Sequence, residues 1–442
     1  MTMPAPVRRW WITVPVILVA LLLGTFGVLA AVRSVGVADL AAVKADLRRA
    51  GEIEDYATWR NQPLPGDPTA SDALAAALRA FADENILDPF GKAFGGTGSS
   101  TTAATARTAL PAILARQATG AAVLHAALGV PGAVFNSRHR LPTDPVAAAK
   151  LVVSSPDLAT NLLVARAYAQ HLASRARLEA DPVALADLRR LVRAMAASDL
   201  LIDAMVMVSI QGICDQTHLA LAREGRLTGQ ALDAWLLDGV DPMPVVDRAL
   251  TTERCAFGGL LFEIMAEDGS LVTDSGIVTL GPFNAPYWWA VADGDGAHLI
   301  RGLHQYQIAA RTGTGSLPIV NPTGLDRWTR MLSSIVLPNL GESLTVTLRA
   351  EAHVRANRAA ALLIRDGGSP AAIAPLLDRG PTRIRLGYEA LGGKRVRIAV
   401  DLSKPQPGLA AADRFRSDRC IGAPAQVTPA LTDNEGIEFD LP

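Results

Sequence analysis

The sequence predicts a mainly α-helical protein with an N-terminal transmembrane helix, an antiparallel helical body and a small C-terminal antiparallel β-sheet. Three observations support this fold class. Residues 10–32 contain no charged side chain. Apolar residues then recur at helical spacing from about residue 37 to residue 267, and the C-terminal segment alternates between apolar and polar residues as strands do. Hydrophobic residues make up 50% of the chain and charged residues 19%, which is typical of an ordered globular body.

The first element is the uncharged run of residues 10–32, WWITVPVILVALLLGTFGVLAAV. Roughly 20 apolar residues cross the hydrocarbon core of a bilayer, and Trp10 and Trp11 stand where interfacial aromatics hold a helix end. A cleavable signal peptide is the alternative, since Val28-Leu29-Ala30 fits a small-residue cleavage site. The apolar region of such a peptide is usually about 7–15 residues long, so the length of this run favours an uncleaved anchor.

The basic residues beside this run give no clean orientation, because Arg8 and Arg9 precede it while Arg33 and Lys44 follow it. The short tail before the run is typical of a signal anchor. We therefore expect a single-pass protein of the cytoplasmic (inner) membrane with a large extracytoplasmic C-terminal domain. The expected partner is the lipid bilayer through residues 10–32, with an envelope protein as a further candidate. The net charge of −1 argues against nucleic acid as a partner.

The chain divides by composition into five parts. These are the tail and transmembrane anchor (1–36), a juxtamembrane helix ended by Gly51 with a Pro-rich linker (37–69), a helical domain (70–268), an irregular segment rich in Gly, Pro and aromatic residues (269–340), and a long helix followed by a small β-sheet (341–442). Helical spacing places four residues in the core of the helical domain, namely Leu162, Leu188, Met205 and Leu261.

Helix starts are marked by Asp or Ser before Pro. The Asp or Ser side chain accepts a backbone N–H at the N-cap, and Pro fits the first helical turn. The pairs are Asp144-Pro145, Ser155-Pro156, Asp181-Pro182, Asp241-Pro242 and Ser369-Pro370.

The C-terminal sheet is predicted to begin with a hairpin of residues 382–390 and 394–401. A two-residue turn would place the apolar sets of the two strands on opposite faces, so we expect a three-residue loop, Leu391–Gly393. That loop sets Tyr388 opposite Val396, Leu386 opposite Ile398, Glu389 opposite Arg395 and Arg383 opposite Asp401. A further strand, Ile437–Leu441, would bring its acids to Arg385 and Arg397. The arginines would then form a self-neutralised solvent face, and an anion-binding or lipid-binding patch is the alternative.

The layout of the chain resembles that of a known but loosely defined group. An N-terminal anchor precedes Ala-rich paired helices with an embedded Glu253-Arg254, and a late helix leads to a small β end. This resembles a diffuse group of uncharacterised bacterial single-pass membrane-anchored proteins. The segment His353–Leu362, followed by Gly367-Gly368-Ser369-Pro370, is also distantly similar to the helix-to-sheet step of major pseudopilins.

The candidate binding residues lie in two neighbouring segments. Adjacent aromatics in Tyr287-Trp288-Trp289 can stack on a sugar or lie at a lipid interface, although burial in the core is the favoured interpretation. The run from Asp293 through Asp295 to His298 is similar to the start of a calcium loop. It lacks the third acidic ligand and the Glu at position twelve, so a Gly-rich polar turn is expected.

No further chemistry is predicted. The cysteines Cys214, Cys255 and Cys420 have no metal-ligand spacing and are expected to be buried and unpaired. Neither a metal site nor another cofactor is expected, and the chain has no G-x-S-x-G motif. The sequence therefore favours a non-catalytic, membrane-tethered binding or scaffold protein of the bacterial cell envelope. The alternative is an envelope enzyme of the hydrolase class, with a site near Trp288, Asp293, Asp295 and His298.

Overall fold

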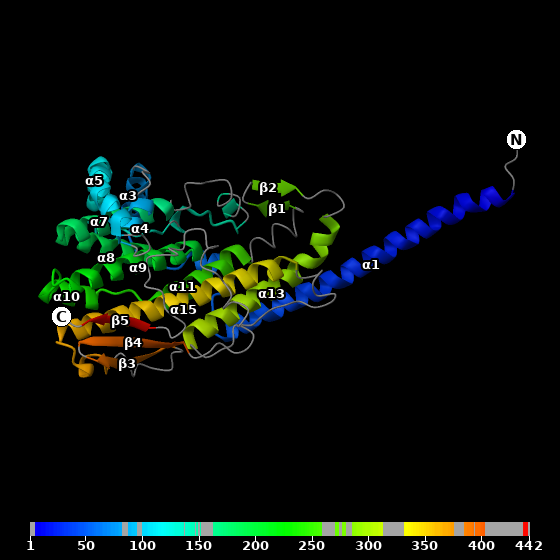
Figure 1. Cartoon of the computed structure of the whole chain (residues 1–442). Helices are drawn as coiled ribbons and strands as arrows, with labels where there is room; N and C mark the ends of the chain where they lie inside the picture. Colours follow the sequence, from blue (N-terminus) through cyan, green and yellow to red (C-terminus); the bar gives the residue numbers. More distant parts are fainter. Residues whose placement is uncertain are drawn as a thin grey trace.

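One long helix projects from a mainly helical body in the computed structural model (Figure 1). The structure describes residues 5–81, 87–94, 100–136, 138–145, 147–148, 151, 162–258, 270–273, 276–279, 285–312, 331–374, 384–392, 394–402 and 436–440. The predicted fold class is confirmed: an N-terminal apolar helix, a helical body and a small antiparallel sheet.

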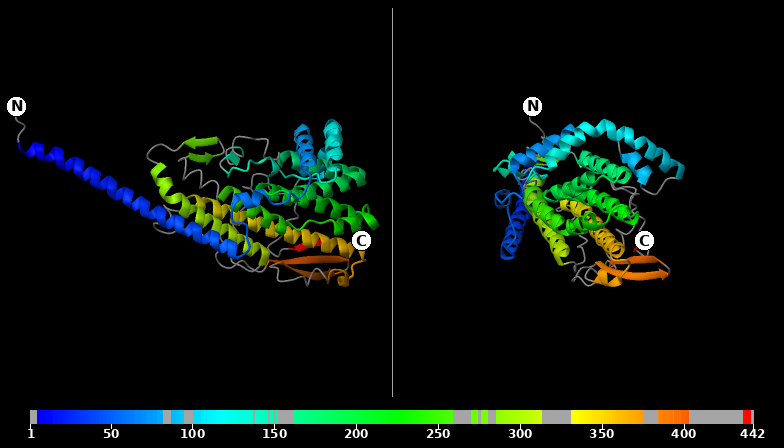
Figure 2. Two further views of the ribbon diagram at one scale, coloured as in Figure 1. Left: turned by 180° about the vertical axis from the view of Figure 1, so that it is seen from behind. Right: turned by 90° about the vertical axis from the view of Figure 1, so that its left-hand side faces the viewer.

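The long helices and the sheet set the layout of the body. The helices are α1 (Ala5–Arg49), α3 (Pro68–Ala80), α4 (Leu87–Phe94), α5 (Ser100–Leu128), α7 (Leu162–Glu179), α8 (Pro182–Ala196), α9 (Leu201–Arg223), α10 (Gly229–Leu237), α11 (Pro242–Thr252), α13 (Ala285–Thr312) and α15 (Met331–Arg365). The strands are β1 (Ser270–Thr273), β2 (Gly276–Thr279), β3 (Ile384–Gly392), β4 (Arg395–Leu402) and β5 (Gly436–Asp440). Figure 2 shows α5 arching over one side of the body and the β3–β4–β5 sheet on the opposite side.

The helix α1 exposes apolar side chains around residue 22, and one face of its C-terminal part packs against the body. Leu21 and Leu22 are 62% and 68% exposed, whereas Val43 and Leu47 are 3% and 1% exposed and pack on Ala297 and Ile300 of α13. By length and composition, α1 is apolar and long enough to cross a membrane, and the most apolar window of the helix is not buried in the body. The predicted stop at Gly51 is confirmed, because Gly51 has φ +73° and its N–H donates to the carbonyl of Arg48 at 3.1 Å.

A membrane-spanning run is expected to make few contacts with residues beyond about 70, and this prediction is wrong for the last two turns of residues 10–32. Phe26 stacks on Trp289 of α13 with 5.8 Å between ring centroids, and Leu29 and Val32 pack beside Trp288. The physical reason is the aromatic start of α13, which packs on these turns. A run of 23 residues covers about 34 Å of helix and the hydrocarbon core roughly 30 Å, so less than one turn is left over and α13 meets the run itself.

The interval 269–340, predicted to be irregular, contains regular structure. It holds the β1–β2 hairpin, all of α13 and the first turns of α15, which begins at Met331 rather than near residue 341. Pro286 lies in the first turn of α13, where its missing N–H costs least. The glycines that suggested a turn lie inside α13, and Gly294 faces Gly36 where α1 comes close.

Where the two helices come close, Gly36 of α1 faces Gly294 of α13. A Cβ added to Gly36 would lie 2.7 Å from the backbone nitrogen of Gly294, whereas a Cβ added to Gly294 would meet only the Cα of Gly36, at 3.5 Å. The contact therefore requires glycine on the α1 side. Helix propensity alone disfavours glycine, and here tertiary packing overrides it.

We predict that Gly36→Val lowers the free energy of unfolding of the detergent-solubilised protein by about 1–3 kcal/mol, the usual cost of overpacking a fitted contact. Gly294→Ala is the matched control and is expected to be neutral or stabilising by up to about 1 kcal/mol, because its methyl group has room and alanine favours helix. Chemical unfolding followed by helical circular dichroism checks both variants. Equal destabilisation by the two would contradict the asymmetric contact.

The predicted linker between α1 and α3 is a packed segment. It contains the short helix α2 (Tyr56–Arg60), whose Tyr56 and Trp59 are buried beside Ala148 and Cys255. Asp55 caps α2 by accepting the N–H of Thr58 at 2.8 Å. Proline content indicated a connection here, but the two buried aromatic side chains fasten it to the body.

The Asp-Pro helix starts are confirmed where the structure describes them. Asp181 accepts the N–H of Val183 at 2.9 Å and Asp241 that of Met243 at 3.1 Å, each with Pro in the first turn. Asp144 accepts the N–H of Ala147 at 2.7 Å. Ser369 makes no such bond before its 3-10 turn, and Ser155-Pro156 lies outside the described residues.

The helical body has one large core. Leu188 is fully buried as predicted, and Met205 is half-buried. The side chain of Leu162 and all of Leu261 lie outside the described part of the chain. Helix α9 runs through this core between α7, α8, α11 and α15 (Figure 1).

The sheet has order β3-β4-β5, and its apolar face is the predicted one. Leu386, Val396, Ile398 and Ile437 are buried against the body. The predicted hairpin register is wrong by two residues: Tyr388 pairs with Ile398 rather than Val396. Gly392 pairs with Arg395, so the turn is shorter and begins later than predicted, and a register shift between Ala390 and Gly392 puts one extra residue within β3.

The charged positions of the sheet are aligned in this shifted register. Glu389 lies opposite Arg397, with 3.8 Å between carboxylate and guanidinium, and not opposite Arg395. Arg385 lies opposite Asp401 instead of Arg383, which lies outside the described residues. In β5, Glu438 lies opposite Arg397 as predicted, whereas Asp440 lies opposite Arg395 rather than Arg385. The register thus favours a self-neutralised face over an anion-binding patch.

Candidate functional site

All six residues predicted to bind lie on the first four turns of α13, packed beside α1. Trp288 is 5% exposed among Ala290 and Val291, as the core interpretation of the aromatic patch predicts. Tyr287 and Trp289 are half-buried, and the guanidinium of Arg33 lies 4.5 Å from the centroid of the Trp289 ring. The aromatic patch therefore joins α1 to the body.

The acidic part of this segment is helical, and the prediction of a Gly-rich polar turn is wrong. Asp295 is fully buried, while Asp293 and His298 are half-buried. Helical geometry spreads these three side chains along two turns, rather than folding them around one point as a calcium loop does. Within the described ranges, no group of three His, Cys, Asp or Glu side chains is arranged to hold a metal ion.

A first polar network joins the end of α1 to the body at a buried arginine. Arg254 lies in a π-helical turn, Glu253–Gly258, that follows α11, and it is 1% exposed. Its guanidinium donates to Gln307 of α13 at 2.6 Å, to the carbonyl of Ile53 at 3.0 Å and to Glu52 at 3.3 Å. One arginine therefore fastens the residues that follow α1, the turn after α11, and α13.

The same network extends towards solvent through a second arginine. Arg311 donates to both carboxylate oxygens of Asp247 at 2.9 Å and also pairs with Glu52. The hydrogen bond from Arg311 and the nearby charges hold the pKa of Glu52 below its ordinary value. Gln307 closes the network by donating to Thr251 at 2.7 Å and to the carbonyl of Asp247 at 3.0 Å. We call these residues, with Arg254, the anchor junction.

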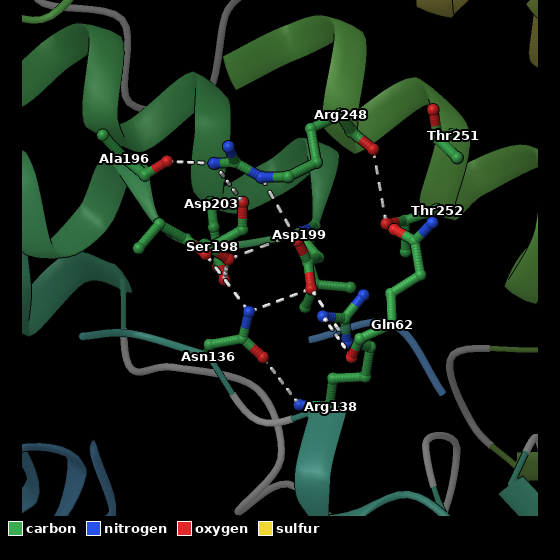
Figure 3. Close-up of polar contacts among 12 residues, drawn as sticks. Gln62, Asn136, Arg138, Ala196, Ser198, Asp199, Asp203, Arg248, Thr251 and Thr252 are labelled. Atoms are coloured by element: carbon green, nitrogen blue, oxygen red, sulfur yellow. Dashed lines mark hydrogen bonds and ion pairs between the residues drawn. The ribbon is translucent and has the colours of Figure 1, made fainter. Parts of the chain in front are cut away.

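A second buried network centres on Asp199, in the turn between α8 and α9 (Figure 3). Asp199 is 5% exposed and lies between two arginines, 3.5 Å from Arg138 and 3.2 Å from Arg248. Asn136 donates to Asp199 at 2.9 Å and accepts the N–H of Arg138, also at 2.9 Å. We call this group the Asp199 cluster.

The Asp199 cluster holds the segment after α2 against the body. Arg138 donates to the carbonyl of Pro63 at 2.8 Å and to that of Trp59 at 3.2 Å, and its guanidinium lies 5.3 Å from the centre of the Trp59 ring. The indole of Trp59 donates to Thr252 of α11 at 3.0 Å. Burial lowers the pKa of Arg138, and the carboxylate of Asp199 opposes that effect.

A third buried group pairs a thiol with an imidazole on α9. The Cys214 sulfur lies 3.6 Å from Nδ1 of His218, which also contacts the carbonyl of Cys214 at 2.8 Å. Burial raises the pKa of the Cys214 thiol well above its ordinary value and lowers that of His218 to about 3. Both groups are therefore neutral at physiological pH, whereas a cysteine nucleophile needs a thiolate.

These networks can hold the fold together, and most of them could not be predicted from the sequence. The sequence indicates the Glu253-Arg254 dipeptide only as part of a layout, and the π-helical turn there gives it a structural role. Arg138 and Asp199 gave no signal, because 61 positions separate them and no periodicity links them. The buried cysteines Cys214 and Cys255 confirm the expectation for those two residues, and Cys420 lies outside the described residues.

Two glutamates, the buried Glu351 and the half-buried Glu253, make stability depend on pH. Burial raises the pKa of Glu253 and of Glu351 to about 7 in the folded protein, from an ordinary value near 4.5. The folded state therefore binds these protons more tightly than the unfolded state. Their contribution to stability is fully present below about pH 4.5 and is lost as the pH rises through 7.

We predict that the free energy of unfolding falls between pH 6 and pH 8, and that Glu253→Gln together with Glu351→Gln removes much of this fall. A tenfold change in proton affinity corresponds to about 1.4 kcal/mol. The neutral imidazoles of His171 and His218 act in the opposite direction below pH 6.5, so comparing parent and variant isolates the glutamates. Urea unfolding at each pH is the measurement, with exposed Glu389→Gln as control. An unchanged slope in the double variant would refute the prediction.

Comparison of the chain with family models, curated proteins and solved structures gives no match. The resemblance to bacterial single-pass membrane-anchored proteins and to major pseudopilins therefore stays a prediction. What the chain does has to be inferred from its own residues and their arrangement.

Proposed function

We propose that this protein is a single-pass anchor protein of the bacterial cytoplasmic membrane, whose extracytoplasmic body is a non-catalytic binding or scaffold domain. The observation that carries the proposal is the continuity of α1. One helix begins with exposed apolar residues such as Leu22 and ends with Val43 and Leu47 buried in the body. An uninterrupted helix transmits position and orientation, so the body is held in a set position and at a set angle relative to the bilayer.

The anchor junction supports the same proposal. Glu52, three residues after the end of α1, is paired with both Arg254 and Arg311, and Arg301 of α13 pairs with Asp39 of α1 at 2.6 Å. A flexible tether would need none of these contacts. Ion pairs that hold a helix in one orientation suit a protein that presents a surface to a partner at a defined place.

The hydrolase alternative needs Trp288, Asp293, Asp295 and His298 to converge around a substrate. Trp288 and Asp295 are buried on a helix that packs along α1, which gives them a direct structural use. The acid–base chemistry of a hydrolase requires groups within about 3 Å of the reacting atoms. The arrangement on α13 therefore favours the scaffold over the enzyme.

The test is chemical crosslinking in intact membranes, followed by affinity purification of the tagged full-length chain. We expect a defined partner that also captures this chain when the partner carries the tag. Purified protein assayed in parallel should give the same hydrolytic background as the Asp295→Asn and His298→Gln variants. Hydrolysis that is lost in both variants would overturn the scaffold proposal in favour of the enzyme.

A further inference from the structure

The start of α13 lies beside the end of the apolar run of α1. The Trp289 ring stacks on Phe26, with 5.8 Å between centroids, and the Arg33 guanidinium covers it at 4.5 Å. Arg33 also donates to the Trp289 carbonyl at 3.4 Å. Phe26 and Arg33 are two helical turns apart, so Trp289 lies at the level of residue 29 or 30 of α1.

This level matches the second face of a bilayer. Trp10 and Trp11 mark one end of the apolar run, and about 19 residues separate Trp11 from the level of Trp289. At 1.5 Å per residue this is about 28 Å, close to the roughly 30 Å thickness of a hydrocarbon core. Arg33 follows directly, where a cation reaches the headgroups.

The two helices run in parallel away from this level. Gly36 approaches Gly294, Asp39 pairs with Arg301, and Glu52 pairs with Arg311, so positions increase together along α1 and α13. The residues before Trp289 therefore extend towards the bilayer. Pro286 is exposed and Tyr287 is half-buried at that end.

The sequence around the N-terminal end of α13 suits a position at the same face of the bilayer. Residues 276–292 contain no charged side chain, and Asp274 and Asp293 are the nearest charges on either side. Figures 1 and 2 both show the first turn of α13 and the β1–β2 hairpin at the end of the body from which α1 projects. Tyrosine and tryptophan are enriched at membrane–water interfaces because their rings are amphipathic.

We propose that the N-terminal end of α13 enters the headgroup region of the bilayer that α1 crosses, with Tyr287 and Trp289 as the second interfacial aromatic belt. This rests on the proposed anchoring by α1. The anchor helix supplies the belt on its own side through Trp10 and Trp11, and the body supplies the other. The body is thereby seated on the membrane surface at a fixed tilt, rather than raised above it on a stalk.

The test places an environment-sensitive fluorophore on single cysteines of the full-length protein in phosphatidylcholine–phosphatidylglycerol vesicles. Cys214 and Cys255 are buried, so a Cys420→Ser background suffices. The labelled variants are Pro286→Cys, Leu22→Cys as the membrane control and Leu237→Cys, at an 85% exposed position on α10, as the aqueous control. Spin-labelled lipids quench at the headgroup or deep in the acyl chains.

The expected result is loss of emission from position 286 with the headgroup quencher, loss from position 22 with the deep quencher, and no loss from position 237. Full emission from 286 alongside quenching at 22 would overturn the aromatic belt and leave the anchor standing. Full emission from both would remove the anchor and the belt together. If the fluorophore at position 286 escapes the headgroup quencher only in oligomeric protein, this end contacts a second copy of the chain. That result also overturns the proposal.

Discussion

Arg254→Met is expected to lower the free energy of unfolding by about 3–5 kcal/mol, the cost of breaking a buried ion pair from one side. The side chain is 1% exposed, and its removal leaves the oxygens of Gln307 and Ile53 and part of Glu52 without their donor. Because those oxygens belong to the segment after α1 and to α13, the loss should also loosen α1 from the body. Unfolding in urea gives the energy, and protease cleavage near residue 52 reports the loosening.

The control for this variant is Arg365→Met. Arg365 pairs with Asp233 at 3.0 Å and with Asp366 at 2.7 Å, but all three side chains are exposed to solvent to a third or more. Exposed pairs usually contribute less than about 1 kcal/mol. If the two variants lower the free energy of unfolding equally, the burial of Arg254 does not explain its effect. The anchor junction would then not be what holds α1 to the body.

Arg138→Met is the second change with a large expected effect, again about 3–5 kcal/mol. It removes one of the two cations beside Asp199 and the donor to the carbonyls of Trp59 and Pro63. Arg138→Lys should recover only part of this loss, because an ammonium cannot reproduce the planar fork of a guanidinium.

The coupling between Arg138 and Asp199 can be measured directly. In a double-mutant cycle, Arg138→Met and Asp199→Asn together should lower the free energy of unfolding by less than the sum of the single changes. The reason is that Asp199→Asn removes the charge that Arg138→Met leaves poorly compensated. Urea unfolding of the four proteins is the measurement. Strict additivity would show that the 3.5 Å pair contributes nothing of its own.

The parts of the fold that local chemistry determines could be predicted from the sequence. Asp181 and Asp241 cap helices because an Asp side chain and a following Pro suit a helix start wherever it occurs. Gly51 ends α1 because it adopts a positive φ. The apolar face of the C-terminal sheet follows from strict alternation, which survives a register error of two residues.

Features that depend on tertiary contacts could not be predicted in this way. In the sequence alone Gly294 indicates a turn, and only the fold shows that it lies within α13 and faces Gly36. The later turn and the shift in β3 near Leu391 leave no mark in the alternation, and together they move the partner of Tyr388 from Val396 to Ile398. Of the candidate site, the sequence supplied the residues of the aromatic patch, but only the position of Phe26 shows what the patch contacts.

The most direct test of the central claim compares two positions on α1 that are equally exposed in the folded chain. Leu22 is 68% exposed and Val35 is 69% exposed, so a soluble protein would let a thiol reagent reach both alike. Leu22→Cys and Val35→Cys, each in a Cys420→Ser background, are treated in native membranes with a polar maleimide added to both sides. We predict alkylation of the cysteine at position 35 and protection of the one at position 22 until detergent and denaturant are added. Equal alkylation of the two in intact membranes would contradict a transmembrane α1, and with it the account of this protein as a body held on a membrane helix.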